Sequence, residues 1–262
     1  MSKRTRQREL ARLRARREAE RQRARRRRAL LGGLWLNRER PASSAAAAST
    51  VPSTTTPPND ARADAPTAPA TVACGGRIPP RVKHPTFKSA PTTRVDPAKT
   101  YLATFQTSCG RFTARLDPKR APVTTANFAF LAGRGFYDST WFHRIVPGGQ
   151  AGIAVIQGGD PTGTGTGGPG YTIKDEKPKS PAAYKKYSLA MANSGRPNSG
   201  GSQFFISTAD NSKGLKADYS VFGQVVDGQA VVDKIAAVPV GGQSGDTPGE
   251  AVWIEKLTVK VR

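Results

Sequence analysis

Residues 189–207 read LAMANSGRPNSGGSQFFIS, in which two short apolar runs flank a segment rich in Gly, Ser, Asn and Pro. Short apolar runs bounded by such turn-forming residues are typical of β-strands. We therefore predict strands around 189–193 and 203–207. Similar runs lie outward from this stretch, around 141–146, 154–157 and 221–226.

A β-hairpin is predicted ahead of these runs. YLATFQT (101–107) is rich in β-branched and aromatic residues, SCG turns the chain, and RFTARL (111–116) alternates its apolar residues on one face. Pro122 and Gly133 fit the start and stop signals of a helix. A second helix is predicted at 230–237 and a last strand at 252–261. Short strands with Gly-rich turns and two helices indicate a mainly β barrel or sandwich.

Two motifs are long enough to be specific. FHRIVPG (142–148) is followed by IQGGDPTGTGTGGPGY (156–171), and residues 189–207 are followed by YSVFGQVVDG (219–228). With residues 121–144 they resemble the cyclophilin family of peptidyl-prolyl cis–trans isomerases, over about residues 96–262. The resemblance implies a closed eight-stranded antiparallel β-barrel capped by two α-helices. It also implies cofactor-free isomerisation of Xaa-Pro bonds in proline-containing polypeptides during protein folding.

The resemblance assigns the candidate site residues as well. Arg144 matches the catalytic arginine, and Gln157 matches the residue that orients it. A fixed cation near the prolyl nitrogen would stabilise the twisted amide, while an apolar socket positions the ring. The substrate-binding candidates are Phe142, Phe205 and Leu215 as pocket walls, Asn193 and Gln203 as holders of the substrate backbone, Ala192 as a small pocket residue, and Tyr219, where many members carry His.

The sequence departs from the family pattern near this site. GQAGIA inserts several residues before Gln157, and Ala154 and Val155 stand where a large pocket residue is usual. This departure leaves turnover open and favours the alternative of a low-turnover proline-peptide binding module or chaperone. The tryptophan associated with cyclosporin binding is absent, with Lys213 or Gly214 near its place, so we expect weak cyclosporin binding.

Other chemistries have weaker support. Residues 165–170 formally match G-x-G-x-x-G, but no helical pattern follows, so nucleotide binding is not expected. Ser202 lies in GGSQF, which is not G-x-S-x-G, and its best candidate base would be His143. Two Cys and two His are too few for a typical zinc site, and we expect neither a metal nor a cofactor.

The N-terminal part is basic and then Pro-rich. Residues 1–40 hold 16 Lys and Arg against 4 Asp and Glu, a net charge of +12 out of +22. Their composition permits a helix, and they either contact anionic lipid or RNA or form a solvated arm. Residues 41–95 are rich in Pro, Ala and Thr, which predicts a mostly disordered linker with ordered structure from about Asp96. The expected isomerase domain is 96–262, and we expect a monomer.

The cellular compartment stays open. Cys74 and Cys109 can form a disulfide in an oxidising compartment or remain two free thiols. The apolar stretch 29–36 is too short to span a membrane, which favours a cytoplasmic or membrane-associated location over a secreted one. The small-residue run 45–48 keeps export open. Similar proteins with a basic start, a Pro/Thr linker and a Cys before the domain look actinobacterial and are often membrane-anchored.

Overall fold

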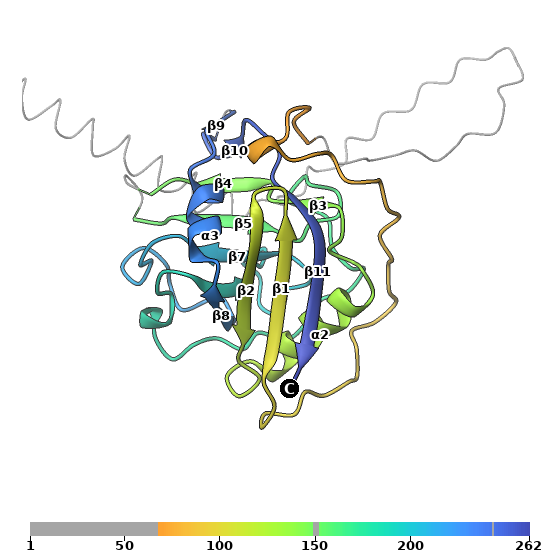
Figure 1. Ribbon diagram of the computed structural model, residues 1–262. Helices are drawn as coiled ribbons and strands as arrows, with labels where there is room; N and C mark the ends of the chain where they lie inside the picture. Colours follow the sequence, from red (N-terminus) through yellow and green to blue (C-terminus); the bar gives the residue numbers. More distant parts are fainter. Residues whose placement is uncertain (1–67, 149–151, 243) are drawn as a thin grey trace, which may run out of the picture.

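The computed structural model describes residues 68–148, 152–242 and 244–262. The basic tail 1–40, with its expected helix, and the linker up to residue 67 lie outside the described residues. Figure 1 shows the arrangement of the elements. The strands are β1 (Tyr101–Thr107), β2 (Gly110–Leu116), β3 (Thr140–Trp141), β4 (Arg144–Val146), β5 (Val155–Gly158), β6 (Ser188–Met191), β7 (Phe204–Ser207), β8 (Val221–Asp227), β9 (Val240–Gly241), β10 (Thr247–Pro248) and β11 (Trp253–Val261). The helices are α2 (Pro122–Gly133) and α3 (Gln229–Ala236), with short 3-10 turns η1 (Ala73–Gly75) and η2 (Pro181–Ala183).

Nine of these strands form one curled antiparallel sheet in the order β3-β11-β1-β2-β8-β6-β7-β5-β4, and β9 pairs with β10 separately. The mainly β fold with two α-helices is therefore confirmed, whereas a closed eight-stranded barrel is not. The strand expected over 141–146 divides in two, because β3 pairs with β11 and β4 pairs with β5. Only Phe142 and His143 separate these two edge strands along the chain.

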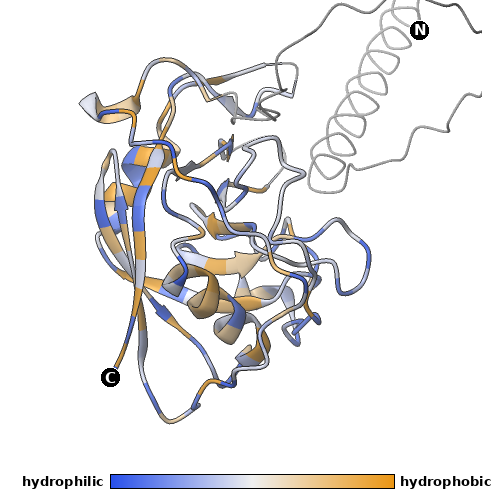
Figure 2. Cartoon of the chain, turned by 90° about the vertical axis from the view of Figure 1, so that its right-hand side faces the viewer, coloured by the Kyte–Doolittle hydropathy of each residue, from blue (hydrophilic) through white to orange (hydrophobic). Residues whose placement is uncertain are grey.

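The predicted hairpin is confirmed and forms one wall of the core. Phe105 of β1 and Phe112 of β2 are register partners, and their stacked rings lie 4.5 Å apart. Phe105 also packs against Phe128 of α2 and Phe204 of β7, with ring centroids 6.2 Å and 5.6 Å away. Figure 2 shows hydrophilic and hydrophobic residues alternating along these long strands. One face of the hairpin is therefore buried, and the other is left to solvent.

Residues 68–95 lie along the domain and make specific contacts with it. Val72 forms a parallel bridge with Ala251, and a disulfide joins Cys74 to Cys109 in the hairpin turn. Further along, the ring of Phe87 lies 5.0 Å from that of Phe130. Contacts with the domain thus begin upstream of Asp96, where the sequence predicted ordered structure to start. A linker composition could not reveal them, because each contact depends on a distant partner.

No helix among the described residues is long and apolar enough to cross a membrane.

Candidate active site

Three polar candidates lie in one row: Arg144 on β4, Gln157 on β5 and Gln203, which directly precedes β7. Arg144 is the register partner of Gln157, and Gln157 that of Phe205. The Nη1 atom of Arg144 lies 3.4 Å from Oε1 of Gln157. Nε2 of Gln157 in turn donates to Oε1 of Gln203, 3.0 Å away. The expected neighbourhood of Arg144 and Gln157 is thus present, and Gln203 extends it.

Asp246 is a fourth member of this row that no sequence motif indicates. The Nε atom of Arg144 donates to Oδ2 of Asp246 over 2.6 Å, and both side chains are only 9% exposed. Ser244 hydrogen-bonds the other carboxylate oxygen, and the amide of Ile145 donates to the carbonyl of Asp246 over 2.9 Å. A buried ion pair with additional hydrogen bonds holds its partners in a fixed orientation. Asp246 therefore anchors the guanidinium from the side opposite Gln157.

An apolar cluster adjoins the row. It contains four of the predicted binding residues, Phe205, Leu215, Tyr219 and Ala192, all buried. The rings of Phe205 and Tyr219 meet edge to face, with centroids 5.3 Å apart. Ala192 also lines the polar cleft, so the cluster and the cleft share a wall.

The inserted residues before Gln157 supply part of this cluster. Ile153 is buried in it together with Val155, so the insertion adds a branched side chain next to Ala154 and Val155, the two residues that stand where a large pocket residue is usual. The amide and carbonyl of Ala154 are both hydrogen-bonded by the side chain of Asn211, at 2.8 Å and 2.9 Å. The insertion therefore ends in a fixed position and contributes to the apolar wall.

Phe142 lies elsewhere. It is fully buried in the main core, where its ring packs edge to face on Phe204 at 6.2 Å. The structure does not bring it together with Phe205 and Leu215. The reason is the break between β3 and β4, which uncouples Phe142 from the strand alternation that sets the direction of Arg144.

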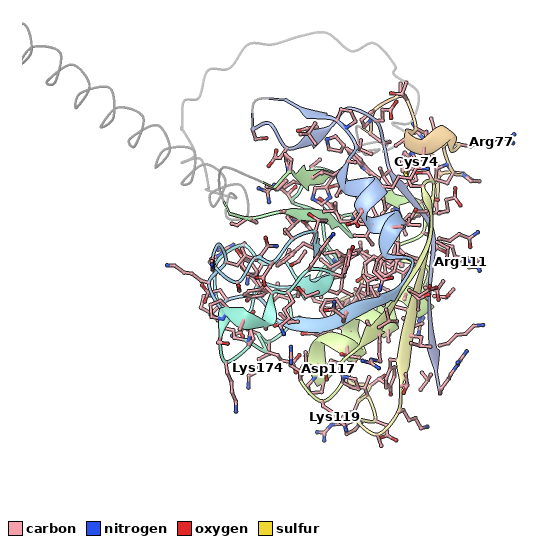
Figure 3. The ribbon with its side chains drawn as sticks, turned by 60° about the vertical axis from the view of Figure 1, so that its left-hand side comes forward. Cys74, Arg77, Arg111, Asp117, Lys119 and Lys174 are labelled. Atoms are coloured by element: carbon pink, nitrogen blue, oxygen red, sulfur yellow. A yellow bond between two sulfur atoms is a disulfide. The ribbon has the colours of Figure 1, made fainter. Side chains whose placement is uncertain are left out.

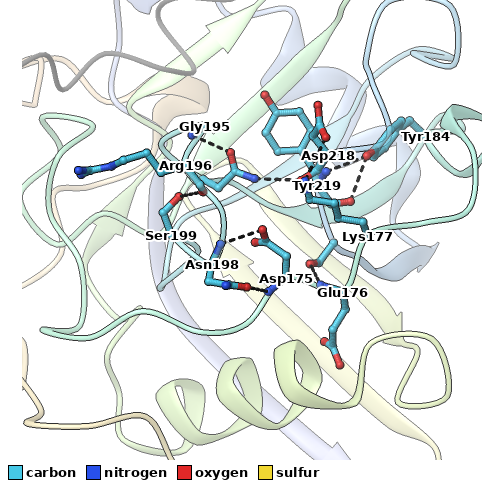
Figure 4. Close-up of polar contacts among 12 residues, drawn as sticks. Asp175, Glu176, Lys177, Tyr184, Gly195, Arg196, Asn198, Ser199, Asp218 and Tyr219 are labelled. Carbon is cyan, nitrogen blue, oxygen red and sulfur yellow. Dashed lines mark hydrogen bonds and ion pairs between the residues drawn. The ribbon is translucent and has the colours of Figure 1, made fainter.

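A cleft of about 550 Å³ lies over the row and is lined by Arg144, Gln157, Ala192, Asn193 and Gln203. Figure 4 shows hydrogen bonds that cross-link the loops around Asp175, Gly195 and Asp218. Nδ2 of Asn193 donates to the carbonyl of Asp218 over 3.0 Å, and its Oδ1 accepts from the amide of Gly195 over 3.0 Å. This side chain is therefore already committed to the loops, which leaves the backbone of Asn193 to meet a ligand.

The Gly-rich loop closes the cleft on another side and is built around Asp160. The fully buried carboxylate accepts hydrogen bonds from the amides of Thr162, Gly165 and Gly167, at 2.6–3.1 Å. An internal anion thus takes amides that could otherwise bind an external anion such as phosphate. The carbonyls of Gly165 and Gly167 accept from Nε2 of Gln203, so the loop also positions the polar row.

His143 faces the cleft but is not paired with Ser202. The hydroxyl of Ser202 donates to the carbonyl of Gly159 over 2.7 Å, and neither ring nitrogen of His143 has a hydrogen-bond partner among the described residues. Burial lowers the pKa of His143 to about 4, with Arg144 lowering it further against the opposite effect of Asp160 and Asp246. His143 is therefore neutral at physiological pH, and Arg144 is the positive charge of the row.

A buried guanidinium, held by Asp246 and Gln157, thus lies beside an apolar cluster and an open cleft. Residues 102–259 match the family described as cyclophilin type peptidyl-prolyl cis-trans isomerase/CLD. The chain belongs to this cyclophilin family.

Related proteins agree with this assignment. The chain is 40% identical over 190 residues to a probable peptidyl-prolyl cis-trans isomerase B of Mycobacterium leprae, covering 67% of this chain and 61% of that protein. It is 40% identical over 182 residues to peptidyl-prolyl cis-trans isomerase B of Streptomyces anulatus, covering 63% and 99%. A cyclophilin type isomerase of Cryptosporidium parvum, solved in the presence of the dipeptide Ala-Pro, matches with a TM-score of 0.54 and 31% identity, covering 61% and 98%.

Proposed function

We propose that this chain accelerates the cis–trans exchange of Xaa-Pro bonds in flexible protein segments, with Arg144 acting on the prolyl amide. The observation that carries the proposal is the hydrogen-bonded row from Asp246 through Arg144 and Gln157 to Gln203 beside an apolar cluster. In this proposal Phe205, Leu215, Tyr219 and Ala192 receive the proline ring, and Asn193 and Gln203 hold the substrate backbone.

The chemistry needs no covalent step. Rotation about the C–N bond is opposed by a barrier of about 18–20 kcal/mol, because the nitrogen lone pair is conjugated with the carbonyl. In the twisted state the prolyl nitrogen becomes pyramidal and its lone pair can accept a hydrogen bond. A guanidinium N–H held at that place stabilises the twisted state more than the planar one.

The stabilisation of the twisted state that this proposal requires is moderate. An acceleration of about 10⁵-fold corresponds to about 7 kcal/mol of differential stabilisation. A charge-assisted hydrogen bond in a buried setting, together with the positioning of the ring, supplies energies of that order. The role of Gln157 and Asp246 is to keep the guanidinium in place, so that little reorganisation accompanies the rotation.

We further propose that the domain works in an oxidising compartment outside the cytoplasm. The disulfide between Cys74 and Cys109 supports this location, because such bonds form and persist under oxidising conditions. The net charge of +12 on residues 1–40 supports attachment of the tail to an anionic partner. Salt-dependent binding of the full chain to vesicles and to RNA would separate the two candidate partners.

The proposed activity is tested by exchange spectroscopy on a short Xaa-Pro peptide with the full chain. Acceleration above the uncatalysed exchange, which takes about 10–100 s, is the expected result. Binding of the peptide without acceleration would instead identify a proline-peptide binding module. That outcome would contradict the proposed reaction while leaving the binding site intact.

A further inference from the structure

The outer face of β2, β1 and β11 carries a regular set of polar and basic residues. Three cross-strand rows follow from the strand register, and in each row the residue of β1 lies between its partners on β2 and β11. The rows are Arg115–Leu102–Lys260, Thr113–Thr104–Thr258 and Arg111–Gln106–Lys256. We call these nine residues, together with Arg262 at the end of β11, the basic face.

The charges of the basic face are not neutralised within the fold. Five of its ten residues are exposed cations, and none of these forms a salt bridge with an acidic side chain in the described part of the chain. Acidic residues adjoin the basic face at three places: Asp227, the partner of Thr113 on β8, Glu255, next to Lys256 in β11, and Asp117, just past the end of β2. By contrast, exposed cations elsewhere, such as Lys177 and Lys186, do form ion pairs.

The basic face is also hollowed. A cavity of about 330 Å³ is lined by residues of all three strands, including Lys256 and Lys260. A second cavity of about 630 Å³ is lined by five basic residues and by Asp117, which pairs with one of them, Arg120. The other four are Lys99, Arg115, Lys119 and Lys185. Arg262 lines the first cavity, and its backbone hydrogen-bonds in both directions with that of Thr100, which lines the second. Two adjoining basic hollows thus extend along one side of the molecule.

The position of the basic face keeps it clear of the candidate active site. In Figure 1 the strands β2, β1 and β11 lie side by side at the front, while β4, β5 and β7, which carry the polar row, lie behind them. Figure 3 places Arg111 on the opposite side of the molecule from Lys174, an exposed lysine outside the basic face, and no residue of the basic face lines the cleft. A partner on the basic face would therefore leave the cleft open to a proline peptide.

We propose that the basic face docks the domain onto an anionic lipid surface. Its chemistry suits phosphate headgroups, since cations at its corners surround a centre of threonine hydroxyls. It carries no aromatic side chain on which a nucleic-acid base could stack. The disulfide in the adjacent hairpin turn supports an oxidising compartment, where lipid headgroups rather than RNA are the abundant polyanion.

The proposal is tested with the full chain and a matched pair of triple variants. The face variant is Arg111→Gln, Lys256→Gln and Lys260→Gln. The control variant is Lys174→Gln, Lys179→Gln and Lys216→Gln, which changes the net charge equally at exposed lysines outside the basic face. Cosedimentation with phosphatidylglycerol–phosphatidylcholine vesicles and with pure phosphatidylcholine vesicles measures the partition coefficient. Binding to a single-stranded RNA is measured in parallel.

The two variants should differ clearly in their partition coefficients on the anionic vesicles. A cation close to an anionic bilayer contributes about fivefold to partitioning, so the face variant should lose on the order of 10²-fold. The control should stay within about threefold of the parent, and neither variant should bind phosphatidylcholine alone.

Equal losses in both variants would overturn the proposal, because they would indicate nonspecific attraction through net charge. Loss of RNA binding alone in the face variant would overturn it in favour of a nucleic acid. Thermal unfolding and Xaa-Pro exchange show whether each variant is folded. If the triple face variant does not fold, the single variant Lys260→Glu takes its place.

Discussion

Arg144 and Asp246 form a buried ion pair across 102 residues of sequence, with Nε of the arginine 2.6 Å from Oδ2 of the aspartate. The pair fixes one edge of the guanidinium, and Gln157 contacts the other. This geometry makes Asp246 a positioning residue in the proposed mechanism, because it acts on a substrate only through Arg144.

The first prediction concerns this ion pair. Asp246→Asn keeps an oxygen acceptor near Nε but removes the charge, so we expect kcat/KM to fall about tenfold, equivalent to about 1.4 kcal/mol. Peptide affinity, read by titration, should change by less than about threefold, and Asp246→Glu should restore part of kcat. A purely structural role would instead lower thermal stability and peptide affinity together, without this split between turnover and binding.

The second prediction concerns the disulfide. Linking Cys74 to Cys109 closes a loop of 35 residues in sequence separation, which in the chain-entropy account contributes about 3–4 kcal/mol. The double variant Cys74→Ser, Cys109→Ser should have a free energy of unfolding, measured with urea, that is lower by about that amount. Thiol titration of the denatured, unreduced protein should find no free thiols. Two free thiols would contradict both the bridge and the proposed compartment.

The third prediction concerns pH. The pKa of His143 is about 4 in the folded protein because of burial, against an ordinary value of 6.5 in the unfolded chain. The unfolded state thus binds more protons between these values, and the free energy of unfolding should fall as the pH drops from about 6.5 to about 4. The full effect is about 3 kcal/mol. His84 also has a lowered pKa through burial and adds in the same direction.

Urea unfolding across this pH range separates the contributions of the two histidines to the slope of the free energy of unfolding against pH. His143→Gln should remove most of the slope, while His84→Gln should remove a smaller part. If His143→Gln keeps the slope of the parent, the buried neutral state assigned to this residue is wrong.

The fourth prediction concerns the contact between two glycines under the apolar cluster. A Cβ added at Gly214 would lie 2.1 Å from the carbonyl oxygen of Gly152, so Gly214→Ala forces the loops apart. We expect a loss of about 1–3 kcal/mol in stability and weaker peptide binding, because Leu215 is the next residue. Gly241→Ala is the matched control, since nothing lies within 4 Å of its added Cβ. Similar unfolding temperatures for the two variants would contradict the close approach.

Local patterns in the sequence predicted much of the fold. The hairpin follows from the alternation of residues such as Phe112, Ala114 and Leu116, which the structure buries on one face. The helix that begins at Pro122 also follows from local signals. The split between β3 and β4 could not be predicted, because it depends on which strand each half pairs with, and its consequence is the burial of Phe142 in the core.

The candidate site was predicted only where a motif carries it. Arg144, Gln157 and Gln203 come from recognisable stretches, and the structure brings them together. Asp246 follows no motif, and only the long-range fold brings it to Arg144. Ile153 belongs to the insertion that made the pocket look incomplete, and its burial among the apolar residues emerges only from the packed loops.

The exchange rate of an Xaa-Pro peptide in the presence of the full chain carrying Arg144→Ala decides whether this guanidinium acts on the prolyl amide. Arg94→Ala is the control, because Arg94 is an exposed arginine that does not line the cleft. We expect Arg144→Ala to lower the rate acceleration on the order of 10²-fold or more, about 2.7 kcal/mol, while the folded protein still binds the peptide and the control matches the parent. If the Arg144→Ala protein accelerates exchange as well as the parent, Arg144 does not act on the prolyl amide.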